Sequence, residues 1–263
     1  MLIQKIQKHV WGFIKAVLPS RWSTPIYKFW NIRFGDEETK RTLLVQKYDQ
    51  KLAKHNILLY RPHLYWLNNP DFLTAQQSWK PKGVPTDRRF FLWQVGRLCR
   101  SLPGSTADCG IAYGTSTYFF LSGLGPRDAP HHIFDSFEGL SAPSKDDGVA
   151  WSKGDICVDE RVVRENLRGF EMCRYYKGWI PSRFAELSED NFAFVHIDVD
   201  LYEPTIDCLR FFYPRLCSGG IILGDDYGFT SCPGARKAFD EFFADKPEML
   251  IEVPNGQVMV VKR

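Results

Sequence analysis

The sequence predicts an α/β fold: a mostly parallel β-sheet with helices on both faces, ending in one antiparallel hairpin. From Thr86 onward, short apolar runs alternate with amphipathic segments, which is the pattern of successive β-α-β units. Near the C-terminus, Met249–Lys262 contains two apolar runs joined at Asn255-Gly256, the strongest short signal for a β-hairpin. The first observation predicts the parallel part of the sheet, and the second predicts its antiparallel edge.

The expected elements follow in chain order. Strands are predicted at Thr106–Ala112, His131–Phe137, Cys173–Lys177, Phe192–Asp198 and Gly220–Gly224. Helices are predicted at Asp87–Leu102, from Gly114 onward, at Asp159–Arg168, at Pro204–Leu216 and at Gly234–Asp245. The first of these helices ends where Pro103-Gly104 interrupts the pattern, because neither residue favours a helix interior.

Residues 1–85 are predicted to form a separate helical extension to a domain that covers residues 86–263. The extension is rich in tryptophan, tyrosine and proline, and 36–48 is one expected helix within it. Apolar residues recur at helical spacing in Met1–Leu18, and residues 1–35 carry six basic residues and no acidic one. This basic helix either docks on its own domain or on a subunit of a homo-oligomer, or it makes a peripheral contact with an anionic membrane.

Composition excludes several other classes of protein. The chain of 263 residues is 44% hydrophobic and 25% charged, which is typical of a soluble globular protein. A net charge of +3 gives no reason to expect a nucleic-acid partner. No run of 18 apolar residues occurs, and the seven cysteines form no CxxC pair, so we expect reduced thiols in a cytoplasmic protein.

Carboxylates follow two neighbouring strands of the predicted sheet. The run Phe194–Tyr202 ends on Asp198 and Asp200, and Gly219–Tyr227 ends on Asp225 and Asp226. Adjacent parallel strands open their carboxyl ends onto one crevice, where carboxylates repel one another unless a cation lies among them. A lone aspartate here could instead cap a helix or pair with an arginine. Two such strand ends favour a site for Mg²⁺ or a similar divalent ion.

The first two strands lead into loops that suit an adenosine-containing ligand. After the first strand the order is Asp108-Cys-Gly110-Ile-Ala-Tyr113-Gly114-Thr115-Ser116, which is not the GxGxxG pattern of nicotinamide enzymes. Glycines there allow close approach of a ligand, and the hydroxyls lie at a helix start. The second strand ends at Asp135-Ser136, where an acid either accepts ribose hydroxyls or forms a turn. The long polar loop 141–155 is expected to cover the site.

Four motifs together resemble the macrocin O-methyltransferase family. They are Asp108–Ser116, Phe134–Leu140, His196–Thr205 and Tyr213–Gly228, in the order in which that family carries them. The resemblance covers roughly residues 86–263. It implies a class I, Rossmann-like, seven-stranded methyltransferase fold and an S-adenosylmethionine- and Mg²⁺-dependent enzyme that methylates sugar hydroxyls of macrolide antibiotics and related glycans.

The resemblance also implies roles for individual residues. Gly110, Gly114 and Ser116 would line the methionine part of the cofactor, Asp135 would hold its ribose, and Asp198, Asp225 and Asp226 would bind the metal. The full set implied for cofactor binding is Asp108, Gly110, Tyr113, Gly114, Thr115, Ser116, Asp135, Ser136, Gly178, Trp179 and Asp198.

Methyl transfer to a sugar alcohol requires alignment with the sulfonium and loss of the hydroxyl proton. A bound cation lowers the pKa of an attached oxygen. Asp198, Asp200 and His196 are the catalytic candidates, with Asp200 preferred as base over His196, which alternation places on the face of Asp198. Three alternatives stay open: a metal-independent methyltransferase that uses Asp200 or His196 as base, an NAD-dependent oxidoreductase, and a non-catalytic binding module. The acceptor is expected to be a glycosylated natural product, a nucleotide sugar or a polysaccharide.

Overall fold

The computed structural model describes residues 64–81, 83–187 and 191–263, together with Phe29, Arg33, Lys40 and Leu43. The chain divides into two compact units, Met1–Pro70 and Asp71–Arg263. The expected helix at residues 1–18 lies outside the described residues, as does the one at 36–48 except for Lys40 and Leu43. In the first unit, Tyr65–Asn68 form the 3₁₀ turn η2.

One sheet organises the second unit. Among the described residues it contains seven strands, in the order β3-β2-β1-β4-β5-β7-β6. They are β1 (Ser105–Cys109), β2 (His131–Asp135), β3 (Cys173–Lys177), β4 (Phe192–Ile197), β5 (Leu216–Gly224), β6 (Ile251–Glu252) and β7 (Val258–Val261). Strands β1 to β5 pair in parallel, and β7 pairs antiparallel with both β5 and β6. The predicted fold class is confirmed, including the terminal hairpin.

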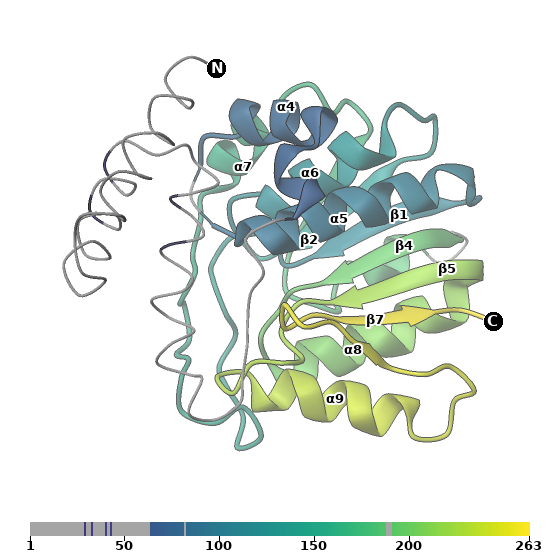
Figure 1. The fold of residues 1–263 in the computed structure, drawn as a ribbon. Helices are drawn as coiled ribbons and strands as arrows, with labels where there is room; N and C mark the ends of the chain where they lie inside the picture. Colours follow the sequence, from purple (N-terminus) through teal and green to yellow (C-terminus); the bar gives the residue numbers. More distant parts are fainter. Residues whose placement is uncertain are drawn as a thin grey trace, which may run out of the picture. The chain divides into compact units, whose positions relative to one another are not determined.

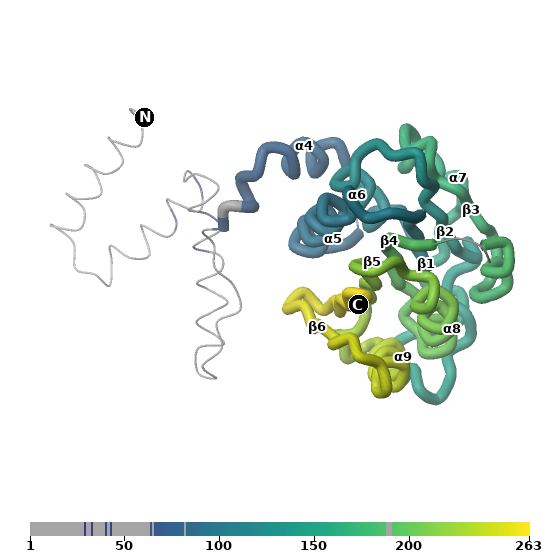
Figure 2. Tube along the Cα trace, turned by 90° about the vertical axis from the view of Figure 1, so that its right-hand side faces the viewer, coloured from purple at the N-terminus to yellow at the C-terminus, as the bar shows by residue number. Residues whose placement is uncertain are grey.

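Helices cover both faces of this sheet (Figure 1). From Pro70 onward, the described α-helices are α4 (Pro70–Ser78), α5 (Thr86–Leu98), α6 (Thr115–Leu124), α7 (Glu160–Asn166), α8 (Tyr202–Phe212) and α9 (Pro233–Phe243). Short 3₁₀ turns lie at η3 (Cys99–Ser101), η4 (Phe184–Leu187) and η5 (Tyr213–Arg215). Figure 1 and Figure 2 show α5 and α6 together on one face and α8 and α9 together on the other. No helix of the described residues is long and apolar enough to cross a membrane.

The two faces of β4 divide the core between these helix layers. All six of its residues are buried, as expected for a central parallel strand. Val195 and Ile197 belong to the apolar cluster that includes Phe212 of α8 and Phe239 of α9. On the opposite face, the ring of Phe194 stacks on Phe120 of α6, with centroids 3.9 Å apart. His196 lies on the same face as Phe194, and this places an ionisable ring under the α5–α6 layer.

Element boundaries differ from the predicted ones for identifiable reasons. Strands β1 and β2 end earlier than predicted. The reason is that Gly110 and Phe137 adopt positive φ values of 80° and 56°, which are incompatible with an extended strand. Helix α8 begins at Tyr202 because Pro204 is tolerated in a first turn, and it ends at Phe212 because Pro214 cannot donate a helical hydrogen bond. All seven cysteines are described, and all are free thiols.

Helices α5 and α6 pack backbone against backbone at two glycines. A Cβ atom on Gly96 would lie 2.2 Å from the carbonyl oxygen of Phe120, and one on Gly123 would lie 2.0 Å from that of Trp93. Such close approach brings the aromatic side chains of α4, α5 and α6 into contact, as in the Phe72 and Trp93 pair at 6.0 Å. The position of α5 is therefore fixed relative to the sheet.

We expect Gly123→Ala to destabilise the protein by about 1–3 kcal/mol, because the added methyl group collides with the backbone of α5. Urea denaturation measures the change. Ser122→Ala, on the same helix but half-buried, is the control and should stay within about 0.5 kcal/mol of the wild type. An unchanged unfolding midpoint for Gly123→Ala would contradict the tight helix contact.

His131, at the start of β2, makes stability depend on pH. Its ring is buried, and Nδ1 hydrogen-bonds with the hydroxyl of Thr106 at 2.8 Å. Burial lowers the pKa of His131 from 6.5 to about 4. Between these values the unfolded chain binds a proton that the folded chain does not. We therefore expect stability to fall by about 3 kcal/mol as the pH drops from about 6.5 to about 4. Urea titrations of wild type and His131→Gln should diverge in this range, and parallel pH profiles would contradict the prediction.

Candidate active site

A cavity of about 500 Å³ opens at the carboxyl ends of all five parallel strands. Every loop that follows β1 to β5 contributes to its wall, as does the start of α5 through Arg88. This edge is where ligands of open α/β sheets bind. Of the predicted site residues, those lining the cavity are Gly110, Asp135, Ser136, Gly178, Trp179, Asp198, Asp200, Asp225 and Asp226.

Gly110 brings the ends of β1 and β4 together at the centre of the cavity. Its φ of 80° favours glycine. A Cβ atom at this position would lie 1.9 Å from the carbonyl oxygen of Asp198. The backbone amide of Asp198 in turn donates to the carbonyl of Cys109 at 2.9 Å. Only glycine therefore allows the acidic end of β4 to lie against the loop after β1.

Asp135 and the loop after β3 form one half of the cavity. The carboxylate of Asp135 accepts hydrogen bonds from the amides of Ile111, at 2.8 Å, and Phe137, at 2.6 Å. Burial raises the pKa of Asp135, and these amide contacts oppose that change. Gly178 and Trp179 add a partly exposed aromatic wall nearby. This half combines one oriented acid with flat apolar surface.

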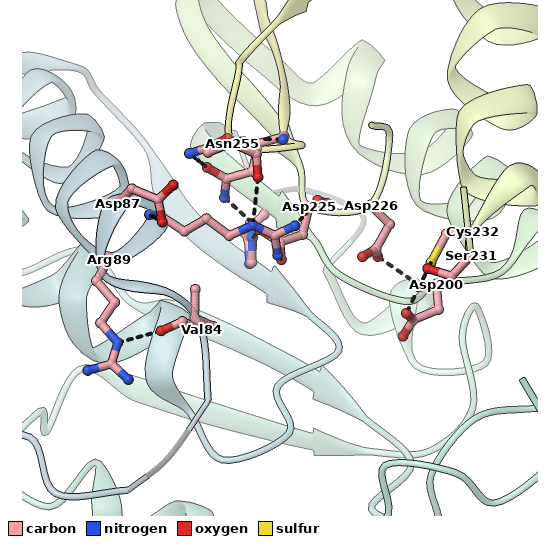
Figure 3. A network of polar contacts seen from close by, with 12 residues as sticks. Val84, Asp87, Arg89, Asp200, Asp225, Asp226, Ser231, Cys232 and Asn255 are labelled. Carbon is pink, nitrogen blue, oxygen red and sulfur yellow. Dashed lines mark hydrogen bonds and ion pairs between the residues drawn. The ribbon is translucent and has the colours of Figure 1, made fainter. Parts of the chain in front are cut away.

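The other half of the cavity holds the acids that follow β4 and β5. Figure 3 shows Asp225 and Asp226 next to each other, with Asp226 directed towards Asp200 and Cys232. The amide of Asp200 donates to Asp226 Oδ2 at 3.2 Å, and the Cys232 thiol donates to Asp200 Oδ1 at 3.5 Å. Potential ligand atoms of Asp200, Asp226 and Cys232 lie within 4.8 Å of one another, and so do those of His196, Asp198 and Asp225. The three predicted metal ligands thus belong to two adjoining groups.

Arg88 of α5 is the site residue that sequence reasoning missed. Its guanidinium forms a buried ion pair with the carboxylate of Asp225 and donates to the Asp225 carbonyl at 3.1 Å. The Nε atom also donates to the carbonyl of Asn255, in the β6–β7 turn, at 3.1 Å. A signal was present, because Arg88, Leu92 and Val95 share one buried helical face. A cation on such a face requires a buried anion as partner.

Four charged side chains form a continuous line that leads from beneath the cavity into its wall. Asp108 Oδ1 contacts His196 Nδ1 at 3.0 Å, and His196 Nε2 contacts Asp225 Oδ1 at 3.4 Å. Arg88 binds the other oxygen of Asp225. We name these residues, Asp108, His196, Asp225 and Arg88, the buried charge line. Thr117 of α6 donates to the second oxygen of Asp108. Neither Asp108 nor His196 lines the cavity.

The charge line separates the acids into two electrostatic classes. Burial alone would lower the pKa of His196, but Asp108 and Asp225 raise it well above its ordinary value. Burial alone would raise the pKa of Asp225, but His196 and Arg88 lower it. By contrast, burial raises the pKa of Asp198 well above its ordinary value, and the charges of Asp225 and Asp226 raise it further.

Asp226 and Asp200 behave like Asp198. Burial, with the charges of Asp200 and Asp225, raises the pKa of Asp226 well above its usual value. Burial raises the pKa of Asp200 to about 6. Among the described residues, no protein donor binds the carboxylate of Asp198. An added cation would stabilise the ionised forms of these three side chains. Asp225 differs because it already has two cationic neighbours, His196 and Arg88.

The start of α6 lies behind the cavity wall. Thr115 and Ser116 are buried in its first turn, and Gly114 precedes them with a φ of 81°. The side chain of Tyr113 is 45% exposed to solvent. None of Tyr113, Gly114, Thr115 and Ser116 lines the cavity, so any contact of theirs with a cofactor stays a prediction.

The polar loop 141–155 docks across the acidic half. Trp151 lines the cavity and donates through Nε1 to the Cys232 sulfur at 3.3 Å. The buried carboxylate of Asp147 accepts from the amide of Tyr202, at the start of α8, at 2.6 Å. A carboxylate at a helix N-terminus is favourable because it accepts a free N–H group and faces the positive end of the helix dipole. Lys237 of α9 holds Asp146 at 2.8 Å.

The chain is similar to known proteins. The sequence model of the macrocin O-methyltransferase (TylF) family matches residues 97–254. The chain belongs to this family. Its match contains the strand ends with all four cavity aspartates after β4 and β5, whereas Arg88 and Asn255 lie outside the matched residues.

Individual relatives and a solved structure extend the comparison. The chain is 30% identical over 159 residues to demethyldecarbamoylnovobiocin O-methyltransferase of Streptomyces niveus, covering 55% of this chain and 60% of the relative. It is 28% identical over 152 residues to a tetracenomycin 4'-O-methyltransferase of Streptomyces olivaceus whose full name specifies a dimethoxyrhamnosyl group, covering 52% and 58%. The chain thus matches about 60% of the length of these relatives. The structure of the O-methyltransferase NovP superposes with a TM-score of 0.56 at 24% identity, covering 68% of this chain and 81% of NovP, and so supports the fold.

Arg88→Met should destabilise the protein by about 3 kcal/mol, because it leaves Asp225 buried with one counter-charge fewer. Urea denaturation measures the loss, and the double variant Arg88→Met/Asp225→Asn should recover part of it. Arg97→Met is the control on the same helix, since Arg97 is exposed and should change stability by less than about 1 kcal/mol. If Arg88→Met were as stable as Arg97→Met, the ion pair would not support the fold.

Proposed function

We propose that this protein is an S-adenosylmethionine-dependent O-methyltransferase that methylates a sugar hydroxyl of a glycosylated small molecule with the help of a divalent cation. The observation that carries the proposal is the composition of the cavity. One half presents an oriented acid and an aromatic wall, and the other half presents Asp198 and Asp226, whose pKa values are raised by burial and raised further by neighbouring negative charge. Family membership supports the same reaction class.

The first half suits the cofactor. Asp135 is fixed by the amides of Ile111 and Phe137, and each carboxylate oxygen retains a lone pair for a ribose hydroxyl. Trp179 and Gly178 offer flat surface to an adenine ring. Gly110 lines the cavity next to Asp198, where the amino-acid part of the cofactor would lie. The sulfonium would then face the acidic half.

The donor set of the second half fits a divalent cation. Asp198, Asp226 and the remaining lone pairs of Asp225 would hold the ion, as oxygen ligands suit Mg²⁺. When bound, such an ion lowers the pKa of an alcohol and fixes two neighbouring hydroxyls. Asp225 is the best-oriented of the three because Arg88, His196 and Gln257 all contact its carboxylate, the last at 2.6 Å.

Among the chain's own residues, Asp200 is positioned to accept the hydroxyl proton. It lines the cavity, and burial raises its pKa to about 6, which keeps it ionised yet basic near neutral pH. We assign His196 to orienting Asp225, because both ring nitrogens make buried contacts and the ring lies outside the cavity. The relatives named for novobiocin and rhamnosyl-tetracenomycin support a glycosylated acceptor.

We expect Asp198→Asn to lower kcat by on the order of 100-fold while the affinity for S-adenosylhomocysteine stays within a factor of about three. Transfer from radiolabelled S-adenosylmethionine to a panel of glycosides with vicinal hydroxyls measures the first quantity, and calorimetry measures the second. Asp207→Asn is the matched control, because Asp207 lines the cavity but lies outside the acidic groups.

Chelation separates this mechanism from its metal-independent alternative. Excess EDTA should abolish transfer by the wild type, and added Mg²⁺ should restore it. Full activity in EDTA would instead support Asp200 acting as base without a cation. Absence of any calorimetric signal with S-adenosylhomocysteine would overturn the methyltransferase proposal itself.

A further inference from the structure

Phe229 is an exposed aromatic side chain within the wall of the cavity. It lies between β5 and α9, three residues after Asp226, whose carbonyl accepts the Phe229 amide hydrogen at 3.2 Å. The side chain is 40% exposed and lines the cavity together with Asp225 and Asp226. Burying a phenylalanine side chain stabilises a folded protein, so a ring left partly exposed here contributes less stability than a fully buried one would.

The ring of Phe229 is held in place. The guanidinium carbon of Arg88 lies 4.4 Å from its centroid, over one face. At Gly256, in the β6–β7 turn, a Cβ atom would lie 2.6 Å from the tip of the ring, and the φ of 94° also favours glycine. The amide of Gly228 donates to the Gly256 carbonyl at 2.8 Å, which ties the preceding backbone to the same turn. These contacts therefore hold the ring of Phe229 in one orientation.

Strand order places Phe229 away from the proposed cofactor half. Asp135 and Trp179 follow β2 and β3, whereas Phe229 follows β5, with β1 and β4 lying between them in the sheet. The aspartates after β4 and β5 therefore separate the aromatic wall at Trp179 from the aromatic ring at Phe229. Phe229 thus lies on the β5 side of the acidic half of the cavity.

We propose that Phe229 is the stacking platform for the acceptor sugar, with the apolar C–H face of a pyranose lying on its exposed surface. This inference rests on the proposed function and adds a subsite to it. The negative face of an aromatic ring attracts the weakly positive C–H groups of a sugar. With one ring face on Phe229, the hydroxyls at the sugar edge reach towards Asp200 and Asp226. Arg88 then orients both the platform and Asp225.

Binding of simple probes tests the platform without turnover. The probe is methyl α-L-rhamnopyranoside, titrated into protein saturated with S-adenosylhomocysteine and Mg²⁺ and followed by saturation-transfer NMR. Phe229→Ala should weaken its binding roughly three- to tenfold, and Phe229→Trp should preserve it. Affinity for S-adenosylhomocysteine, and for Mn²⁺ measured by electron paramagnetic resonance, should not change in either variant.

The chain offers a matched control for this experiment. Phe211 of α8 also carries a guanidinium over its ring, that of Arg215 at 3.9 Å, but it lies outside the cavity. Phe211→Ala should leave rhamnoside binding at the wild-type value. A loss equal to that of Phe229→Ala would show that the effect is not local and would overturn the proposal.

Three further outcomes would overturn the platform. The first is equal rhamnoside affinity of Phe229→Ala and wild type, and the second is no rhamnoside binding by the wild type at millimolar concentration. The third is loss of binding in Phe229→Ala for phenol, used as a probe of an aromatic aglycone, with rhamnoside binding retained. In each case wild-type binding of S-adenosylhomocysteine would leave the proposed methyltransferase function standing, whereas its absence would remove that function independently.

Discussion

The buried charge line from Asp108 through His196 and Asp225 to Arg88 is the constraint on which the site depends. Its members lie in β1, in β4, directly after β5 and in α5, so it links three adjacent strands to a helix. Isolated charges are costly to bury, and each member here is tolerated because its neighbours carry the opposite sign. The raised pKa of His196 and the lowered pKa of Asp225 both follow from this alternation. Removing one member would leave another unpaired beneath the cavity.

The same line explains why the cavity acids are not equivalent. Asp225 faces two cations from below, and its orientation is set before any ligand arrives. Asp198 and Asp226 lie beyond the line and face the cavity, where burial and mutual repulsion raise their pKa values. The protein thus combines one oriented, charged carboxylate with two whose ionisation would be favoured by a cation. Because folding has already oriented the Asp225 carboxylate, ligand binding need not supply the free energy that orienting it would cost.

Sequence reasoning recovered the features that depend on local pattern. Alternating apolar runs gave the parallel strands, Asn255-Gly256 gave the hairpin, and strand ends gave Asp198 and Asp225. Pairing across the fold was less accessible, because Arg88 and Asp225 are 137 residues apart. The sequence offered three interpretations of a strand-end aspartate: a metal ligand, a helix cap or an arginine partner. Asp225 does have an arginine partner, Arg88. The direction of the Asp108 side chain was equally inaccessible from the sequence. The family resemblance implied that Asp108 binds the cofactor, whereas in the structure its carboxylate contacts His196.

Several residues around the cavity have a strained backbone conformation, which the surrounding structure must stabilise. Among the described residues other than glycine, positive φ values occur at Ala112, Phe137, Ile156 and Asp200, each in a loop at the carboxyl edge of the sheet. Strain of this kind costs about 1–3 kcal/mol per residue and persists only where the surroundings enforce it. Around Asp200 the enforcing contacts are with Asp226 and with Cys232, which Trp151 of the loop 141–155 also binds. The loop after β2 is therefore linked to the acid after β4 through Cys232, and a change in the docking of this loop would alter the surroundings of the proposed base.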